Sequence, residues 1–454
     1  MQVASYRGPG CAGGVSPALA RLIATNPAHQ IRWWHLEGHD IKCATRQPAE
    51  ESPKKSLSQQ IVEGHYRYCN EFLWPIMHGL PKYARYQPED RIAYERFSRI
   101  FSRQILAHGG AEKLFAQDYQ LALLAQELKR HEGPGCGVFW HIPWPESVPE
   151  KFLSPLIDLA KALLFAEFIG FHTQEYVDNF VRFVSMHVPR TLCLNDEIVV
   201  ASRRSLRCKV VSAPLGLDVD YWRNLSARRN TRLHPSLIDA RLLNSKFVLS
   251  VDRADYTKGV VERLRGIDLF FQYHPEMKGE VTFAQLCTRT RPGITGFDSY
   301  WSRCQKMIGD INNRHRVNGW QPLVSLPGPI GANELSVLYK KAAVMLVTPL
   351  KDGLNLTAKE FVACQQEKPG VLALSRHAGV WHELGNWSLD VEPSDPASIS
   401  YALNAALSMP HEQKVALSNG MLNSLQKNTI SNWCNVFSNM LEVAADDKEE
   451  IVNV

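Results

Sequence analysis

Short apolar runs alternate with amphipathic segments of helical period over most of the chain. The runs lie at 137–142 in the first half and at 247–251, 281–286, 344–348 and 371–374 in the second, each bounded by Gly, Pro or charged residues. An apolar run of this length with such boundaries is typical of a buried strand. Because these strands alternate with helices, the pattern predicts the α/β class, with parallel sheets covered by helices.

The segment 89–106 is the clearest helix prediction. It follows Pro88, and apolar residues recur along it at mixed spacings of three to five residues. Four arginines on this helix are expected to form a solvated face: Arg91, Arg96, Arg99 and Arg103.

A domain boundary is expected within 212–222, where Pro and Gly separate two series of strands. We therefore predict an N-terminal Rossmann-like domain at 1–216 and a C-terminal one at 217–429. Two such sheets facing one another across a hinge would place a ligand cleft at the carboxyl ends of their strands.

Composition and charge narrow the class of protein. The chain has 454 residues, of which 45% are hydrophobic and 21% charged, so wholesale disorder and fibrous structure are excluded. Its 51 Lys and Arg against 46 Asp and Glu leave a net charge of +5. This small, dispersed excess suits an anionic small molecule and argues against a nucleic-acid partner.

The chain is expected to be cytoplasmic, without a membrane segment. Its ten cysteines form no CxxC pair and no regular framework, which favours buried free thiols over disulfides or zinc ligands. No uncharged apolar stretch reaches the roughly 18 residues that a membrane helix needs. The richest stretch, 156–171, carries three charged residues, and no signal-peptide core precedes Arg7.

The segment 347–366 combines a strand end, a turn with Asp352 and Gly353, and a helix that begins near Asn355. The first amides of a helix bind phosphate, and Gly353 permits a close approach or an unusual backbone angle. Asp352 could accept hydrogen bonds from sugar hydroxyls, and Glu360, one turn along, could hold a ribose diol. A well-capped helix with a surface Asp and Glu explains the same spacing equally well.

A second strand-to-loop segment, 248–259, carries Arg253 and Lys258 five residues apart. Two cations here suit a diphosphate leaving group, whose charge grows as its bond to a sugar breaks. Charge-assisted hydrogen bonds contribute roughly 1.5 to 3 kcal/mol each and a helix terminus about 0.3 to 1, so the cations should dominate. The alternative is a surface Arg and Lys paired with Asp252 or Asp255.

Weaker candidates lie at other strand ends. His141 is expected at the end of the strand 137–142, where a purely structural histidine is the commoner case. Gly13 and Gly14 follow Arg7 in a glycine-rich turn that lacks the GxGxxG spacing of a dinucleotide loop.

Further cations and two decoy motifs complete the candidates. Arg289 and Arg291 follow the strand 281–286 and offer another anion site. Two pairs imitate metal-binding motifs but lack further ligands, so we expect no metal at either: Asp218 with Asp220, and His377 with His382.

Taken together, these segments resemble the trehalose-6-phosphate synthase family, retaining glycosyltransferases of the two-domain GT-B fold. The resemblance covers most of the chain, and its most specific parts are VDRADYTKG and DGLNLTAKEFVACQ. The other matching segments are SYRGP, HYRYCNEFLWPIMH, AQDYQL, WHIPWP, FIGFHTQEY and TRTR.

The resemblance implies a nucleotide-sugar donor, usually UDP-glucose, held mainly by the C-terminal domain. Arg253 and Lys258 would bind the diphosphate and stabilise the leaving UDP, and Asp352 would hold glucose hydroxyls. The remaining donor contacts would come from the backbone of Asn355 and Leu356, from Glu360 at the ribose, from His141 near the reacting carbon, and from Gly13 and Gly14 over the diphosphate.

For the acceptor, the resemblance implies a sugar phosphate gripped by Arg7 and Arg291, in a pocket lined by Trp74, Asp118 and Tyr119. His65 falls where the family usually has a tyrosine of that pocket. Further departures from the family pattern also lie in the N-terminal half: Tyr6, Gln117, Gln120 and Trp144.

The family retains anomeric configuration without an evident protein nucleophile, through front-face attack in which the departing phosphate takes the acceptor proton. This implies no metal and no cofactor. The final helix, near 430–445, is expected to cross back to the first domain.

The acceptor stays open among glucose 6-phosphate, which would give trehalose 6-phosphate, and the acceptors of two related classes. WPIMHGLP resembles glucosylglycerol-phosphate synthases, and HIPWP with Trp144 resembles pseudoglycosyltransferases that join cyclitol phosphates. Retention of Arg291 favours glucose 6-phosphate. A non-catalytic regulator that binds sugar phosphates is the alternative of another class, and the sequence leaves homo-oligomerisation open.

Overall fold

The computed structural model describes residues 2–10, 15–17, 19–20, 31–44, 55–194, 197–200, 206–228, 242, 245–328, 330–436 and 439. The chain divides into two compact units, one of Met1–Leu215 with Ile430–Val454 and one of Gly216–Thr429. The second unit thus begins one residue before the boundary expected from the sequence. Gly13 and Gly14 lie outside the described residues.

The described part of the first unit forms a ten-stranded sheet in the order β4-β3-β2-β1-β5-β6-β7-β10-β9-β8. Its middle strands, from β2 to β10 in this order, are parallel, and antiparallel strands lie at both edges. The strands are β1 (Gln2–Arg7), β2 (Arg32–Glu37), β3 (Asp40–Ala44), β4 (Lys55–Ser56), β5 (Leu114–Gln117), β6 (Cys136–Phe139), β7 (Phe168–Phe171), β8 (Thr191–Leu194), β9 (Glu197–Val200) and β10 (Leu206–Ser212).

One strand is shorter than expected. The apolar run 137–142 contains β6, which ends at Phe139, although the Trp140 amide still donates to the Gly170 carbonyl at 2.8 Å. The next amide, that of His141, donates to Asp118 Oδ1 at 3.1 Å and not to a neighbouring strand. His141 therefore lies two residues beyond the strand, in a buried loop.

Helices of the first unit begin and end at recognisable signals. The helix expected at 89–106 is α4 (Pro88–His108), and its buried face includes Phe97, Phe101 and Ile105. Ser58 and Thr173 cap α2 and α7 by accepting hydrogen bonds from backbone amides in the first turn. The other elements are α2 (Gln59–Arg67), the π-helix η1 (Tyr68–Leu73), α3 (Trp74–Met77), α5 (Leu124–Arg130), α6 (Leu153–Leu163) and α7 (Gln174–His187).

The described part of the second unit contains a six-stranded parallel sheet in the order β13-β12-β11-β14-β15-β16. The strands are β11 (Lys246–Arg253), β12 (Val281–Thr288), β13 (Leu323–Ser325), β14 (Val344–Val347), β15 (Val371–Ser375) and β16 (Leu389–Val391). This confirms the four strands expected in this half. From β11 the chain adds strands first toward one edge of the sheet and then, from β14, toward the other edge. The position between β11 and β14, where this order reverses, is where doubly wound sheets bind ligands.

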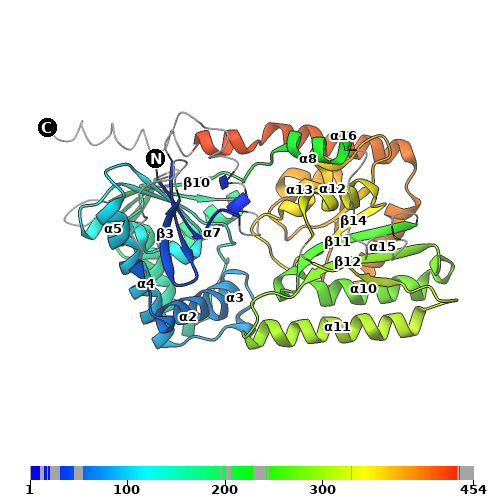
Figure 1. Ribbon diagram of the computed structural model, residues 1–454, viewed down its shortest axis with the longest axis horizontal. Coiled ribbons are helices and arrows are strands. Elements are labelled where there is room, and N and C mark those ends of the chain that lie inside the picture. Colours follow the sequence, from blue (N-terminus) through cyan, green and yellow to red (C-terminus); the bar gives the residue numbers. More distant parts are fainter. Residues whose placement is uncertain are drawn as a thin grey trace. The chain divides into compact units, whose positions relative to one another are not determined.

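Helices cover both faces of this second sheet. Figure 1 shows α8, α12 and α13 on one face and α10 and α11 on the other. The helices are α8 (Val219–Ala227), α10 (Val260–Tyr273), α11 (Thr295–His315), α12 (Ala332–Lys341), α13 (Leu356–Cys364), α14 (Trp381–Leu384), α15 (Pro396–Ser408) and α16 (His411–Lys427). After α16 the chain is again helical at 430–436, where Trp433 packs against Phe115 and Phe139 of the first unit.

Candidate functional site

The carboxyl ends of β11 and β14 bring the two most informative sequence segments together. The loop after β11 carries Lys258, and the turn after β14 carries Asp352. The Lys258 ammonium donates to Asp352 Oδ2 at 2.5 Å, and both side chains are largely buried. Two residues 94 positions apart in the sequence therefore form one charged contact at the switch point of the sheet.

Asp255 is the centre of a second charged cluster in the same loop. Its carboxylate is fully buried and accepts a hydrogen bond from Arg291 Nη1 at 2.8 Å, while Arg253 Nη2 lies 3.8 Å away. Burial would raise the pKa of Asp255, but the charges of Arg291, Arg253 and Lys258 lower it to about 2. The carboxylate therefore holds two of the predicted site cations, and the pairing of Arg253 with Asp255 that the sequence left open is present.

The two arginines of this cluster differ in exposure. The Arg291 side chain is 7% exposed and lies over the ring of Phe297, 4.6 Å from its centre. The Arg253 side chain is 43% exposed. Arg253 is therefore the more accessible of the two to a ligand.

The turn after β14 takes its shape from a residue other than the one expected. The unusual backbone angle falls on Asn355, with φ of 84°, and not on Gly353. Asn355 tolerates this left-handed angle, caps α13 by accepting from the Ala358 amide at 3.1 Å, and donates to Asp352 at 3.1 Å.

A second glycine, Gly379, lies close to this turn. A Cβ on Gly379 would lie 2.0 Å from the Gly353 carbonyl oxygen, so the loop after β15 packs directly on the turn. The Gly379 amide donates to the Asp352 carbonyl oxygen at 3.0 Å. The backbone around Asp352 is thus held by a neighbouring loop that the sequence did not single out.

Helix α13 presents the other predicted donor-side residues. Leu356 is its first residue, and the half-buried Glu360 lies one turn further along. The Tyr339 hydroxyl donates to Glu360 Oε2 at 3.0 Å and so restricts the orientation of that carboxylate.

A buried arginine beneath the strand ends was missed in the sequence. Arg263 is fully buried in α10 and donates to Asp252 at 2.7 Å and to Thr348 at 3.2 Å. It also donates to Gln285 in the middle of β12 at 3.1 Å, so one guanidinium joins three neighbouring strands of the sheet or the residues just after them. The available signal was the position of Arg263 on the apolar face of the helix. An arginine is almost never buried unless it is paired, so an arginine on that face indicates a buried partner.

Four predicted residues of the first unit meet after β5. Asp118 has φ of 70°, and its Oδ1 accepts from the amides of Tyr119 at 3.0 Å and His141 at 3.1 Å. The rings of Trp74 and Tyr119 are 6.0 Å apart, centre to centre. An aspartate held in this strained conformation is the kind of feature that clusters at functional sites.

Arg7 ends β1, the parallel neighbour of β5, and is exposed. Since parallel strands end at one edge of a sheet, it lies on the side from which Asp118 emerges. The glycine-rich turn expected to follow it falls partly on residues that are not described.

His65 lies in the interior of the first unit. It is fully buried, its Nε2 lies 2.9 Å from the Gln120 carbonyl oxygen, and burial lowers its pKa to about 4. The ring stacks on Tyr6 at 5.2 Å and on Phe97 at 3.9 Å. Two departures from the family pattern, Tyr6 and His65, therefore pack against each other, and a contact of His65 with the acceptor stays a prediction.

His141 is joined to two side chains that the sequence did not assign to the site. Its Nε2 lies 2.8 Å from Gln117 Oε1, and its Nδ1 lies 3.2 Å from His172 Nε2. Burial lowers the pKa of His141 to about 3. His172 was present in the quoted motif FIGFHTQEY, and its place just after β7 was the signal that could have drawn attention to it.

The expected decoys have structural partners. Asp218 caps α8 by accepting from the Tyr221 amide at 3.0 Å, and His377 Nε2 lies 3.0 Å from Glu392. Within the described ranges no three or more His, Cys, Asp or Glu side chains gather in a way that could hold a metal ion. In the same ranges no helix is both long and apolar enough to cross a bilayer.

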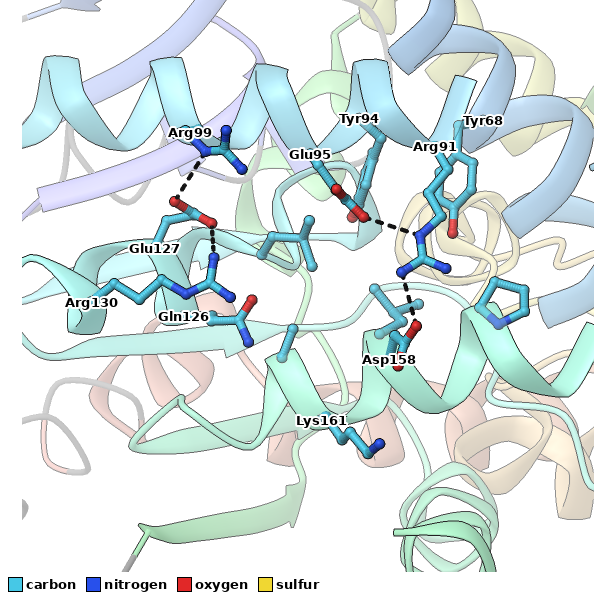
Figure 2. A pocket seen from close by; sticks show the side chains of 14 residues that line it. Tyr68, Arg91, Tyr94, Glu95, Arg99, Gln126, Glu127, Arg130, Asp158 and Lys161 are labelled. Atoms are coloured by element: carbon cyan, nitrogen blue, oxygen red, sulfur yellow. Dashed lines mark hydrogen bonds and ion pairs between the residues drawn. The ribbon is translucent and has the colours of Figure 1, made fainter. Parts of the chain in front are cut away.

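A cavity of about 330 Å³ in the first unit lies between α4, α5 and α6 and contains none of the predicted site residues. Figure 2 shows ion pairs along its wall: Arg91 contacts Glu95 and Asp158, while Arg99 and Arg130 contact Glu127. Of the four arginines expected on a solvated face, Arg96, Arg99 and Arg103 are exposed, while Arg91 is half-buried and contacts Glu95 and Asp158.

Comparison with known proteins links this arrangement to one family. The family model described as glycosyltransferase family 20 matches residues 33–443. The bifunctional trehalose-6-phosphate synthase/phosphatase of Thermoproteus tenax is 32% identical over 402 residues, which is 87% of this chain and 54% of that protein. The UDP-forming alpha,alpha-trehalose-phosphate synthase of Candida albicans is 28% identical over 435 residues, 93% of this chain and 90% of that protein. The chain thus spans about half of the first relative and most of the second.

Solved structures are similar over nearly the whole chain. An alpha,alpha-trehalose-phosphate synthase from Burkholderia xenovorans in complex with glucose-6-phosphate has a TM-score of 0.88 and 28% identity, covering 97% of this chain and 99% of that chain. The E. coli protein bound with UDP-2-fluoro glucose has a TM-score of 0.86 and 27% identity, covering 97% and 98%.

Proposed function

This chain belongs to glycosyltransferase family 20 and has the GT-B fold of its structural neighbours, and from that premise we propose that it is a retaining hexosyltransferase. It moves glucose from UDP-glucose to a phosphorylated acceptor, with glucose 6-phosphate as the leading acceptor and trehalose 6-phosphate as the product. The observation that supports this most directly is the gathering of Arg253, Lys258 and Asp352 at the switch point of the second sheet.

The donor-binding residues act through charge at the diphosphate and through hydrogen bonds at the glucose. Arg253 and Lys258 bind the diphosphate and stabilise the charge that develops on the leaving UDP. Asp352 accepts hydrogen bonds from glucose hydroxyls, and its contact with Lys258 keeps the sugar and phosphate parts of the donor in register. The amides of Asn355 and Leu356 face the phosphate.

In the transfer step, the bond between the glucose anomeric carbon and the oxygen of the UDP phosphate breaks. A bond forms from the same face between that carbon and the acceptor hydroxyl oxygen, so configuration is retained. The hydroxyl proton passes to the departing phosphate oxygen, and UDP leaves. The protein stabilises the phosphate with Arg253 and Lys258, and the step uses neither a metal ion nor an organic cofactor.

The acceptor half carries the remaining alternatives. We propose that Arg7 and Arg291 bind the acceptor phosphate and that Trp74, Asp118 and Tyr119 line its pocket. The stacking of Tyr6 on His65, two departures from the family pattern, is the observation that supports a different phosphorylated acceptor as second candidate, a polyol or cyclitol phosphate.

The test is a matrix of donors and acceptors. The purified chain is offered UDP-, GDP- and ADP-glucose with glucose 6-phosphate, glycerol 3-phosphate or cyclitol phosphates, and nucleotide release and the anomeric configuration of the product are measured. We expect release with UDP-glucose and one phosphorylated acceptor, and an α-linked product. Binding without turnover for every pair would refute the enzyme proposal and favour a sugar-phosphate-binding regulator.

A further inference from the structure

Hydrogen bonds in the first unit link three side chains and one backbone amide in a row. The Leu215 amide donates to His172 Nδ1 at 3.2 Å. His172 Nε2 lies 3.2 Å from His141 Nδ1, and His141 Nε2 lies 2.8 Å from Gln117 Oε1. All three side chains are at least nine-tenths buried.

The backbone amide decides where each proton lies, because an amide can only donate. His172 Nδ1 must accept from Leu215, so the neutral His172 ring carries its hydrogen on Nε2. That hydrogen points to His141 Nδ1, which must then accept. His141 therefore carries its own hydrogen on Nε2 and donates it to Gln117 Oε1.

The same logic orients the Gln117 side chain. Exchanging its oxygen and nitrogen would place an amide donor against the hydrogen on His141 Nε2. No other arrangement of protons gives the Leu215 amide an acceptor at His172 Nδ1. The Gln117 amide nitrogen is left buried, with no hydrogen-bond partner among the described residues. Most buried donors have a partner, and here the hydrogen bonds that start at Leu215 explain which atom of the Gln117 amide is left over.

We propose that Gln117 and His172 are positioning residues that hold His141 as a neutral ring with both nitrogens engaged by the protein, so that the ring offers the donor sugar only its carbon atoms as a fixed packing surface and transfers no proton. This inference rests on the proposed function for the role of His141 in the reaction, but the tautomer is a property of the protein alone. It also agrees with a step in which the departing phosphate takes the acceptor proton.

The surroundings favour the uncharged ring. Phe139 and Trp433 lie 4.5 and 6.3 Å from the His141 ring, centre to centre. The titratable groups that the described residues place in contact with His141 are His172 and Asp118, and Asp118 contacts the backbone amide and not the ring. Gln117, one of the departures from the family pattern, offers an acceptor that never ionises.

The first measurement is made on the protein without substrates. Histidine labelled with ¹⁵N distinguishes the two neutral tautomers and the charged ring, and spectra of His141→Gln and His172→Gln assign the signals. We expect the Nε2–H pattern for both histidines, and for His141 no change in that pattern from pH 8 to pH 5. An Nδ1–H pattern for His141, or its titration near pH 6.5 in the wild type, would overturn the proposal.

The second measurement uses variants of Gln117. Gln117→Glu has the same shape but places a negative charge against His141 Nε2–H, so the His141 pKa should rise by at least one unit. Gln117→Met removes the acceptor and should lower kcat about 2- to 10-fold with KM for UDP-glucose unchanged within about two-fold. Gln413→Glu, the same change at an exposed position of α16, is the control and should alter neither quantity.

These outcomes separate the two proposals. The expected tautomer in a protein that turns over no substrate pair would support the positioning of His141 by Gln117 and His172 and refute the glycosyltransferase activity. Turnover in a wild-type protein with the other tautomer would do the reverse. A fall in kcat for Gln117→Met without any change in the His141 signals would also overturn the positioning role of Gln117, because a merely structural defect would lower kcat in the same way.

Discussion

Asp255→Asn tests how much one buried carboxylate beside the proposed donor site contributes to the free energy of unfolding. The variant keeps the shape of the side chain but removes the negative charge that the buried Arg291 contacts at 2.8 Å. Removing one member of a buried ion pair costs about 3 to 5 kcal/mol of unfolding free energy, and we expect a loss in this range at pH 7.

The pH dependence of this loss follows from the depressed pKa. The folded-state pKa of Asp255 is about 2, against an ordinary value of 3.8. A carboxylate with a lowered folded pKa stabilises the fold above pH 3.8 and loses that stabilisation as pH falls through 2. At about 1.36 kcal/mol per pH unit, the contribution is roughly 2 kcal/mol at pH 7 and about 1 at pH 3. The difference between wild type and variant should therefore shrink by about 1 kcal/mol over this range.

The chain supplies a matched control in a second arginine–aspartate pair. Arg91 and Asp158 are also 2.8 Å apart, but their side chains are 28% and 46% exposed. Asp158→Asn should therefore cost no more than about 1 kcal/mol. Urea unfolding followed by circular dichroism at pH 7 and pH 3 measures both variants. Equal losses for the two variants, or a loss for Asp255→Asn that does not change with pH, would refute the reasoning.

Three further changes test the site and its support. Arg253→Ala should lower turnover about 10- to 100-fold through loss of one charge-assisted contact in the transition state, and an unchanged steady-state rate would remove it from the leaving-group site. Lys359→Met breaks the pair that the fully buried Lys359 forms with Glu383 at 2.5 Å and should cost about 3 to 5 kcal/mol in urea unfolding, while pairing it with Glu383→Leu should recover most of the loss. Gly379→Ala would place a methyl group 2.0 Å from the Gly353 carbonyl oxygen, so calorimetric titration with UDP-glucose should show weaker binding; an unchanged Kd would mean that the turn does not depend on this approach.

Local patterns were sufficient for the elements of the fold. The strands at 247–251, 281–286, 344–348 and 371–374 and the helix at 89–106 are present, because burial on one or both faces imposes the backbone period directly on neighbouring residues. Their ends were less readable. β6 stops at Phe139 where an apolar run continues to Ile142, since apolar character persists in a buried loop after the hydrogen-bonded ladder has ended.

For the candidate site, the sequence predicted individual residues but not how they are arranged. Arg253, Lys258 and Asp352 could be singled out because each follows a strand and carries charge. Gly353 was chosen for a backbone angle that Asn355 adopts, because both stand in the same short turn and only its three-dimensional course distinguishes them.

Family membership and the α/β class were therefore contained in the chain as motifs and periodicity, which depend on residues close together in sequence. The tertiary structure decided which charges meet and which protons are held in place. Lys258 reaches Asp352 across 94 residues, and His141 reaches His172 across 31. Contacts over such separations depend on how strands are ordered in a sheet, and no local pattern of residues encodes that order.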